Sequence, residues 1–161
     1  MKIPKEVHDY LDSLTEKYPR IESVWVFGSR ANNSFKKSSD WDFLIFSNKK
    51  ILDLLKKNAS LKKASQKNRV DSFVVYNGEN FENPWPEVED GVQTPREGIL
   101  SEWKWKKLTP LKAKYKANIL KSEKGSDGKK RFRVEQKALN ALKVWGHEKK
   151  RPKWYCEFLD S

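Results

Sequence analysis

The sequence has little of several features that would define its class. Only one of its 161 residues is a cysteine, Cys156, which excludes an internal disulfide framework. No run of about 18 or more apolar residues is present, which excludes a transmembrane helix. Residues 1–10 lack the apolar centre of a signal peptide. These absences together predict a cytoplasmic protein with no membrane partner.

Positive charge is concentrated in the last part of the chain. Residues 1–100 contain 16 Lys/Arg and 15 Asp/Glu, whereas residues 101–161 contain 18 and 7. Nearly all of the net charge of +12 therefore lies after residue 100. A basic region of this kind favours phosphate-rich partners such as RNA, although lysine-rich segments can also serve only as solvated surface. The apolar content of 37% is enough for a packed core.

The first 78 residues show alternating helix and strand patterns. Apolar residues recur at helical spacing from Ile3 to Tyr18, and Pro19 ends that helix. A second helix is predicted at 49–64, with Asn48 as its cap. Residues 29–39 are expected to form a loop or a short helix. Short apolar runs predict strands at 21–27, 40–46 and 69–76. This order indicates an α/β (α+β) fold in which helices flank one mixed or parallel sheet.

The rest of the chain is predicted to be a linker followed by helices. Residues 79–95 are acidic and contain three of the seven prolines, so we expect an ordered loop pinned by Phe81 and Trp85. The later segments that favour helix are 96–108, 109–121 and 131–146, with a flexible turn at 124–130. The expected organisation is a core at 1–78, an acidic loop at 79–95 and a basic helical C-terminal region at 96–161 packed on the core.

Two aspartates lie one residue apart on the predicted strand 40–46. Because side chains alternate along a strand, Asp40 and Asp42 point to one face, about 6.6 Å apart, while Trp41 faces the packed side. Carboxylates this close repel each other unless a cation joins them, and their oxygens favour Mg²⁺ or Mn²⁺ over Zn²⁺. Asp71, near the start of strand 69–76, can complete a two-metal site and help to deprotonate an attacking hydroxyl.

A Gly-Ser step follows strand 21–27. Gly28 lets the backbone approach a phosphate, and the N–H groups of the turn can hold it. Ser29 adds a hydroxyl donor, and Arg30, Lys36 and Lys37 supply positive charge nearby. The sequence therefore predicts phosphates on the Gly-Ser turn and a metal on the aspartate pair.

This set of residues resembles the DNA polymerase β-type nucleotidyltransferase superfamily. The stretch FGSRANNSFKKSSDWDFLIF is similar to the small bacterial and archaeal members, the minimal nucleotidyltransferases, and the resemblance covers residues 24–75. It implies a nucleotidyltransferase fold and the transfer of a nucleoside monophosphate from an NTP, ATP being the expected one, to a hydroxyl, with pyrophosphate released. Trp41 departs from the family pattern, in which an aliphatic residue usually separates the two aspartates.

The resemblance also implies a role for each site residue. Asp40 and Asp42 would hold two Mg²⁺ ions, and Asp71 would hold the catalytic ion and act as the base. Gly28 and Ser29 would hold the triphosphate. Of the positive charges near this turn, we expect those of Arg30 and Lys37 to bind the nucleotide.

Several functions stay open on this reading. The acceptor can be a hydroxyl of a partner protein, as in family members that modify a toxin and act as antitoxins, the 3′ end of an RNA, or a small molecule. The alternative is a catalytically silent module of the same fold that binds nucleic acid through its basic C-terminal region. A third hypothesis is an interaction protein whose acidic loop recognises a partner.

The Trp-Lys alternation at 102–108 fits either stacking on bases or an amphipathic helix with Trp103 in the core.

Overall fold

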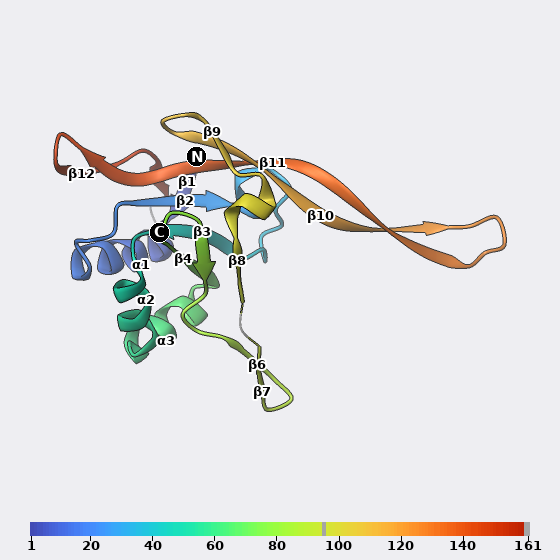
Figure 1. The fold of residues 1–161 in the computed structure, drawn as a ribbon, viewed down its shortest axis with the longest axis horizontal. Coiled ribbons are helices and arrows are strands. Elements are labelled where there is room, and N and C mark those ends of the chain that lie inside the picture. Colours follow the sequence, from blue (N-terminus) through green and yellow to red (C-terminus); the bar gives the residue numbers. More distant parts are fainter. Residues whose placement is uncertain (95, 160–161) are drawn as a thin grey trace.

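The part of the chain that the structure describes forms one curled mixed sheet and three α-helices (Figure 1). The computed structural model describes residues 1–94 and 96–159. Position 95, where the acidic loop is predicted to end, and residues 160–161, the end of the predicted C-terminal region, lie outside the described residues. The main sheet contains β2 (Ser23–Phe27), β3 (Trp41–Phe46), β4 (Val70–Tyr76), β5 (Asn80–Glu82), β8 (Glu97–Ile99), β9 (Lys106–Thr109), β10 (Lys112–Lys124), β11 (Lys130–Glu148) and β12 (Arg151–Trp154). Its spatial order is β8-β5-β4-β3-β2-β11-β10-β9, with β12 paired to β11.

Two small strand pairs lie outside the main sheet. One is parallel and joins the two ends of the chain, β1 (Lys2–Pro4) with β13 (Glu157–Leu159). The other is antiparallel, β6 (Glu87–Glu89) with β7 (Val92–Thr94), and forms a hairpin within the predicted acidic loop. That loop is held to the body as predicted, because Phe81 and Trp85 are buried and the Trp85 indole N–H donates to the Leu55 carbonyl at 2.9 Å.

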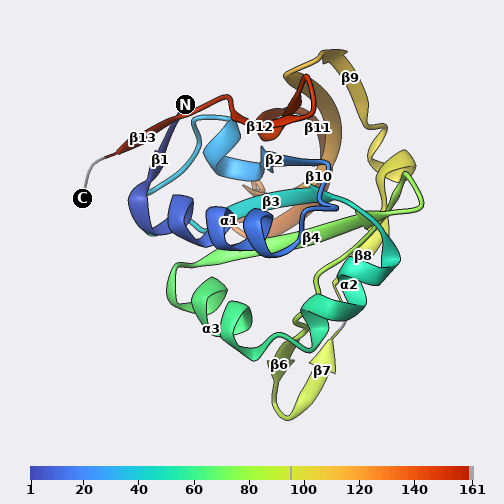
Figure 2. The same ribbon diagram turned by 90° about the vertical axis from the view of Figure 1, so that its left-hand side faces the viewer.

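The three helices lie on the same side of the sheet (Figure 2). They are α1 (Lys5–Lys17), α2 (Lys49–Lys56) and α3 (Ala59–Lys67). Asn48 caps α2 as predicted, accepting a hydrogen bond from the Ile51 N–H at 3.0 Å. The single helix predicted at 49–64 is divided, because Asn58 caps a second helix by accepting from the Leu61 N–H at 3.0 Å.

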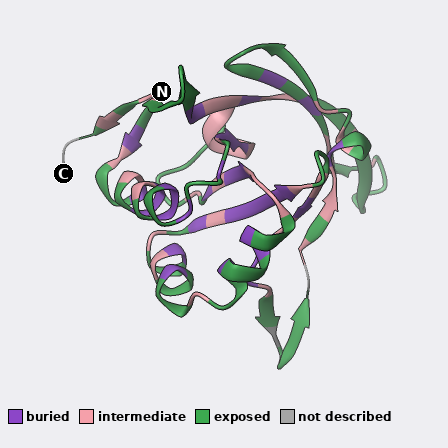
Figure 3. Ribbon diagram, turned by 60° about the vertical axis from the view of Figure 1, so that its left-hand side comes forward, coloured by how far each residue is buried: buried purple, intermediate pink, exposed green. Residues whose placement is uncertain are grey.

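Each face of the central strands contributes to a separate apolar core. The cores account for the burial seen along these strands and on the inner sides of the helices in Figure 3. On the helix side, alternate residues of β3 pack against the helices, as expected of Trp41, Phe43 and Ile45. On the opposite side, Leu44 packs with residues of η2 (Leu100–Trp103), β10 and β11. Trp103 is partly buried there, 4.6 Å from the Phe81 ring, although η2 is one turn of 3-10 helix and not the predicted amphipathic helix.

The prediction that the C-terminal region is helical is wrong. Segments 96–108, 109–121 and 131–146 form mainly strands, of which β10 and β11 make a long antiparallel hairpin that projects from the body (Figure 1). Of the elements predicted for this region, the turn at 124–130 is confirmed, since the Gly125 N–H donates to the Lys129 carbonyl at 2.9 Å. The base of β11 pairs with β2, so the C-terminal region belongs to the central sheet. In the described residues, no helix is both long and apolar enough to cross a membrane.

Candidate functional site

A row of three side chains crosses the centre of the sheet on the face away from the helices. β2 and β3 are antiparallel and place Phe27 opposite Asp42, while β3 and β4 are parallel and place Asp42 beside Asp71. Neighbouring strands are about 4.8 Å apart, and paired residues point to the same face. The structure therefore brings Asp42 and Asp71 together, as the predicted pairing of their strands requires.

The charge of Asp42 is poorly accommodated by the protein alone. Burial, and then the negative charges of Asp71 and Asp40, raise the pKa of the Asp42 carboxyl to about 7. Arg96 opposes this effect, and the Asp71 carboxylate hydrogen-bonds the protonated form of Asp42. Such like-charge crowding in a partly buried site is typical of functional carboxylates and is relieved by a bound cation.

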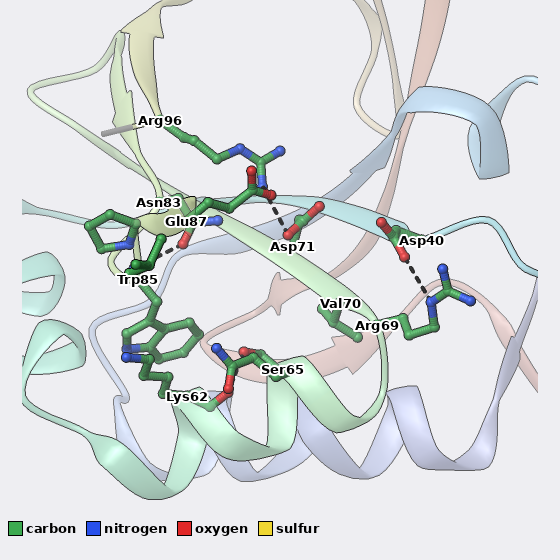
Figure 4. A pocket seen from close by; sticks show the side chains of 13 residues that line it. Asp40, Lys62, Ser65, Arg69, Val70, Asp71, Asn83, Trp85, Glu87 and Arg96 are labelled. Atoms are coloured by element: carbon green, nitrogen blue, oxygen red, sulfur yellow. Dashed lines mark hydrogen bonds and ion pairs between the residues drawn. The ribbon is translucent and has the colours of Figure 1, made fainter. Parts of the chain in front are cut away.

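Asp71 is held by an arginine that follows the acidic loop. The Arg96 guanidinium lies 3.1 Å from Asp71 Oδ1 and 3.1 Å from Glu87 Oε1 (Figure 4). It also stacks 5.0 Å from the centre of the Phe73 ring. Arg96 precedes β8 and is partly buried. The strands therefore position Asp71, and the segment that follows the acidic loop contributes Arg96 as its cationic partner.

Asp40 lies beside this pair without joining it. It precedes β3, its side chain is 49% exposed, and its Oδ1 is 3.1 Å from Arg69 Nε (Figure 4). Among residues 1–94 and 96–159, no three or more His, Cys, Asp and Glu side chains are grouped so as to hold a metal ion. The predicted trio is thus seen as an adjacent pair, Asp42 and Asp71, with a third carboxylate nearby in an exposed ion pair.

Gly28 forms a tight turn over Asp42. Its φ is +71°, a left-handed conformation that side chains disfavour, and a Cβ added there would lie 2.5 Å from Asp42 Oδ2. Its N–H donates to the Tyr115 hydroxyl at 2.8 Å. Burial raises the pKa of Tyr115 to about 12, and the Asp42 charge adds to this despite the opposing Gly28 hydrogen bond. A glycine is required at this turn because Asp42 occupies the space beside it.

The turn is also tied to the hairpin through Asn32. The Asn32 amide donates to the carbonyls of Gly28 at 2.7 Å and Asn140 at 3.0 Å, and its oxygen accepts from the Asn140 N–H at 2.8 Å. Sequence reasoning missed Asn32, Arg96 and Tyr115. Their contacts join segments up to 108 residues apart, so no local pattern identifies them.

The other predicted phosphate-binding residues lie along the loop after Gly28. Ser29 is half-buried in η1 (Gly28–Ala31), and its carbonyl accepts from the N–H groups of Asn32 and Ser34, each at 3.2 Å. Lys37 is exposed. Lys37 is therefore accessible to a ligand, and Ser29 is partly accessible.

Arg30 points away from the carboxylates. It donates to the carbonyls of Lys37 at 3.3 Å and Ser39 at 2.9 Å, and it stacks on Phe35 and on Trp41, whose ring lies on the helix side of β3. In this structure Arg30 shapes the loop, and it is not brought together with Asp42 and Asp71.

Two cavities border the carboxylates, one beside Asp71 and one beside Asp42. One, of about 600 Å³, lies between α3, β4 and the acidic loop and is lined by Asp40, Arg69, Asp71, Trp85, Glu87 and Arg96, among others (Figure 4). The other, of about 400 Å³, has four aromatic rings and several charged side chains in its lining, which consists of Phe27, Asp42, Phe73, Phe81, Arg96, Glu97, Gly98, Glu102 and Trp103. Because Arg96 lines both cavities, each can give a ligand access to one of the two aspartates.

The comparison with known families matches the segment that carries the aspartates. Residues 10–84 match the family model described as Polymerase beta, Nucleotidyltransferase. The match includes Gly28, Asp42 and Asp71 but ends before Arg96 and Tyr115. No curated protein is significantly similar to the chain.

Proposed function

We propose that this chain, whose residues 10–84 form a domain of the DNA polymerase β-type nucleotidyltransferase superfamily, is an active nucleotidyltransferase. It would transfer a nucleoside monophosphate from an NTP, ATP being the expected donor, to a hydroxyl acceptor. The observation that carries this proposal is the pairing of Asp42 with Asp71 directly beneath the Gly28 turn.

The reaction requires the attacking hydroxyl oxygen to lie in line with the bond to the leaving group, and a base that accepts the hydroxyl proton. The acceptor oxygen forms a bond to the α-phosphorus, and the bond from that phosphorus to the bridging oxygen breaks. Pyrophosphate leaves with the bonding electron pair, and the hydroxyl proton passes to a base. We assign the base to Asp71, which borders the larger cavity from which an acceptor can approach. Catalysis of this kind is mainly positioning and charge stabilisation.

The carboxylate pair suits a hard divalent cation. Asp42 and Asp71 present adjacent oxygens, and their mutual repulsion is what a cation such as Mg²⁺ or Mn²⁺ relieves. We propose Asp40 as the third carboxylate that binds a divalent cation at this site. A bound divalent cation would supply positive charge to the triphosphate.

The Gly28 turn and its loop would hold the phosphates. The absence of a Cβ at Gly28 leaves room for the Asp42 carboxylate directly beside the loop, and the Ser29 hydroxyl and the exposed Lys37 would supply donors to the phosphates. Arg30 would assist by fixing the loop through the carbonyls of Lys37 and Ser39. The acceptor class stays open among a protein hydroxyl, an RNA 3′ end and a small molecule.

A transfer assay with labelled nucleotides tests the proposal. The protein is incubated with Mg²⁺ and each α-³²P-labelled NTP, with cell lysate, total RNA or a small-molecule extract in separate tubes. We expect label in protein, RNA or small-molecule fractions, and none with the Asp42→Asn variant. Absence of transfer from all four NTPs in every tube would contradict the proposal.

Tyr115→Phe is expected to impair the site through the Gly28 turn. The change leaves the Gly28 N–H without its acceptor, which costs about 1–3 kcal/mol of unfolding free energy, measurable by urea denaturation. Transfer is expected to fall by about tenfold because the turn over Asp42 is less well fixed.

The matched control is Tyr10→Phe. Tyr10 is buried on the helix side, where its hydroxyl pairs with Ser72 Oγ at 2.8 Å. It should lose a similar unfolding free energy and keep its transfer rate per folded molecule. Equal rates for the two variants would show that the Tyr115 hydroxyl does not act on the site.

The silent-module alternative is favoured by one observation. Two of the three aspartates have internal cationic partners, Asp71 with Arg96 and Asp40 with Arg69. A module whose carboxylates are permanently paired would bind RNA with the same affinity before and after Asp42→Asn and would transfer no label. The transfer assay, together with the RNA affinities of the wild type and of Asp42→Asn, therefore separates the two functions.

A further inference from the structure

The β10–β11 hairpin has two faces that differ in charge. Residues directly opposite each other in an antiparallel pair share a face, and the register pairs Leu120 with Val134 and Lys116 with Ala138. The lysine face, as we name it, consists of Lys112, Lys114, Lys116, Asn118, Leu120, Ser122 and Lys124 on β10 and of Lys130, Phe132, Val134, Gln136, Ala138, Asn140 and Leu142 on β11. It contains five lysines and no acidic residue.

The two acidic residues of the paired hairpin segments, Glu123 and Glu135, lie on the other face. Glu123 bonds to Arg133 at 3.0 Å, and Glu135 bonds to Lys121 at 2.9 Å. Alternation along the strands places all four of these side chains together, opposite the lysine face. Two of the four cationic side chains on the other face, Lys121 and Arg133, are therefore paired with its two glutamates, whereas none of the five lysines of the lysine face has an acidic partner on that face.

The centre of the lysine face is apolar and open. Leu120 is 64% exposed, Phe132 64% and Val134 68%, and Leu120 lies directly opposite Val134. Exposed lysines flank this cluster on both sides, Lys116 toward the body and Lys124 and Lys130 toward the hairpin tip. Contiguous exposed apolar side chains rimmed by charge mark an interaction surface.

We infer that the lysine face binds a partner protein through an acidic amphipathic segment. Apolar residues of the segment would cover Leu120, Phe132 and Val134, while its carboxylates would approach the flanking lysines. The cluster contains a single aromatic ring, which does not suit single-stranded nucleic acid, because bases stack on successive aromatic rings. A second copy of the chain is disfavoured, because two lysine faces would bring like charges together.

The inference does not depend on nucleotide transfer, because the lysine face lies outside the carboxylate site. A library of random peptides of about 16 residues, long enough for a helix of about 24 Å, tests the chemistry of the face directly. It is selected against the full chain and counter-selected against the Leu120→Ser/Val134→Ser variant. We expect enriched peptides to combine an excess of Asp and Glu with apolar residues at helical spacing.

Affinities of one enriched peptide, measured by fluorescence anisotropy, locate the contact. Lys124→Glu on the lysine face should weaken binding by at least about tenfold, because it places a negative charge beside the acidic segment. Lys137→Glu is the matched control, since Lys137 is also exposed but lies on the other face. Circular dichroism verifies that each variant is folded.

Several results would overturn the inference. These are no enrichment over the serine variant, equal weakening by both charge reversals, and enriched peptides without acidic excess. Oligouridine RNA bound more tightly than the peptide, and lost in the serine variant, would assign the face to nucleic acid. Self-association in sedimentation velocity that the serine variant abolishes would assign it to a second copy.

Discussion

The Asp42→Asn variant is expected to lose nucleotidyl transfer by at least about 1,000-fold while keeping its fold. Asparagine has the size of aspartate, so the packing beneath Gly28 is retained. Its neutral amide, however, does not provide the adjacent carboxylates that a divalent cation requires, and Asp71 alone is a weaker ligand. The measurement is kcat/KM with the labelled NTP that gives the highest turnover in the assay.

A binding measurement supports this result without relying on turnover. A ligand that binds only the folded state raises the unfolding temperature, so Mg²⁺ should stabilise the wild type and not Asp42→Asn. Without the cation the variant should unfold at the same or a higher temperature, because it no longer confines a negative charge beside Asp71. Asp53→Asn, an exposed change on α2, is the matched control and should behave as wild type. Transfer by Asp42→Asn within tenfold of the wild type would exclude our assignment.

The first 76 residues could be read from the sequence because their signals are local. Strands predicted at 21–27, 40–46 and 69–76 are found at Ser23–Phe27, Trp41–Phe46 and Val70–Tyr76. Short apolar runs bounded by glycine, asparagine or charged residues leave few alternatives to buried strands. The helix break at Asn58 was missed, although an asparagine before a new apolar repeat is a recognisable cap.

The hairpin was misassigned although the sequence contained its pattern. Residues 112–117 alternate strictly between lysine and Ala113, Tyr115 and Ala117, a period of two that indicates a strand. Phe132 and Val134 alternate with charged residues in the same way. The many lysines and alanines favour a helix by intrinsic propensity, which is a weaker determinant than the pairing of strands. Pairing along the hairpin and with β2 prevails in the fold.

The site could be predicted only in part, for a physical reason. Asp42 and Asp71 follow from strand alternation and the pairing of neighbouring strands, both of which sequence spacing constrains. Arg96, which precedes β8, and Tyr115 on β10 reach the site because the sheet is curled. The positions of β8 and β10 in that sheet depend on pairing between segments far apart in the sequence. Their sequence neighbourhoods contain many similar charged and aromatic residues, so no local feature distinguishes them.

Gly28→Ala is expected to damage both the fold and the reaction. Alanine at φ +71° costs about 1–3 kcal/mol in backbone strain, and its Cβ would lie 2.5 Å from Asp42 Oδ2. Either the Gly28 turn or the Asp42 carboxylate must therefore move. We expect transfer to fall by at least about 100-fold, since displacing a reacting group by about 1 Å has an effect of that size.

Gly78→Ala separates strain from displacement. Gly78 has a similar φ of +79°, but a Cβ there would meet no atom within 4 Å. Urea denaturation should therefore show a loss of unfolding free energy of about 1–3 kcal/mol for Gly78→Ala, from backbone strain alone, and a larger loss for Gly28→Ala. Transfer per folded molecule should be unchanged in Gly78→Ala, because its strain lies in the β4–β5 turn. If both variants lost activity in proportion to stability, the contact between Gly28 and Asp42 would matter only for folding. A selective loss of transfer in Gly28→Ala would show that the position of the Asp42 carboxylate under the turn is what the reaction requires.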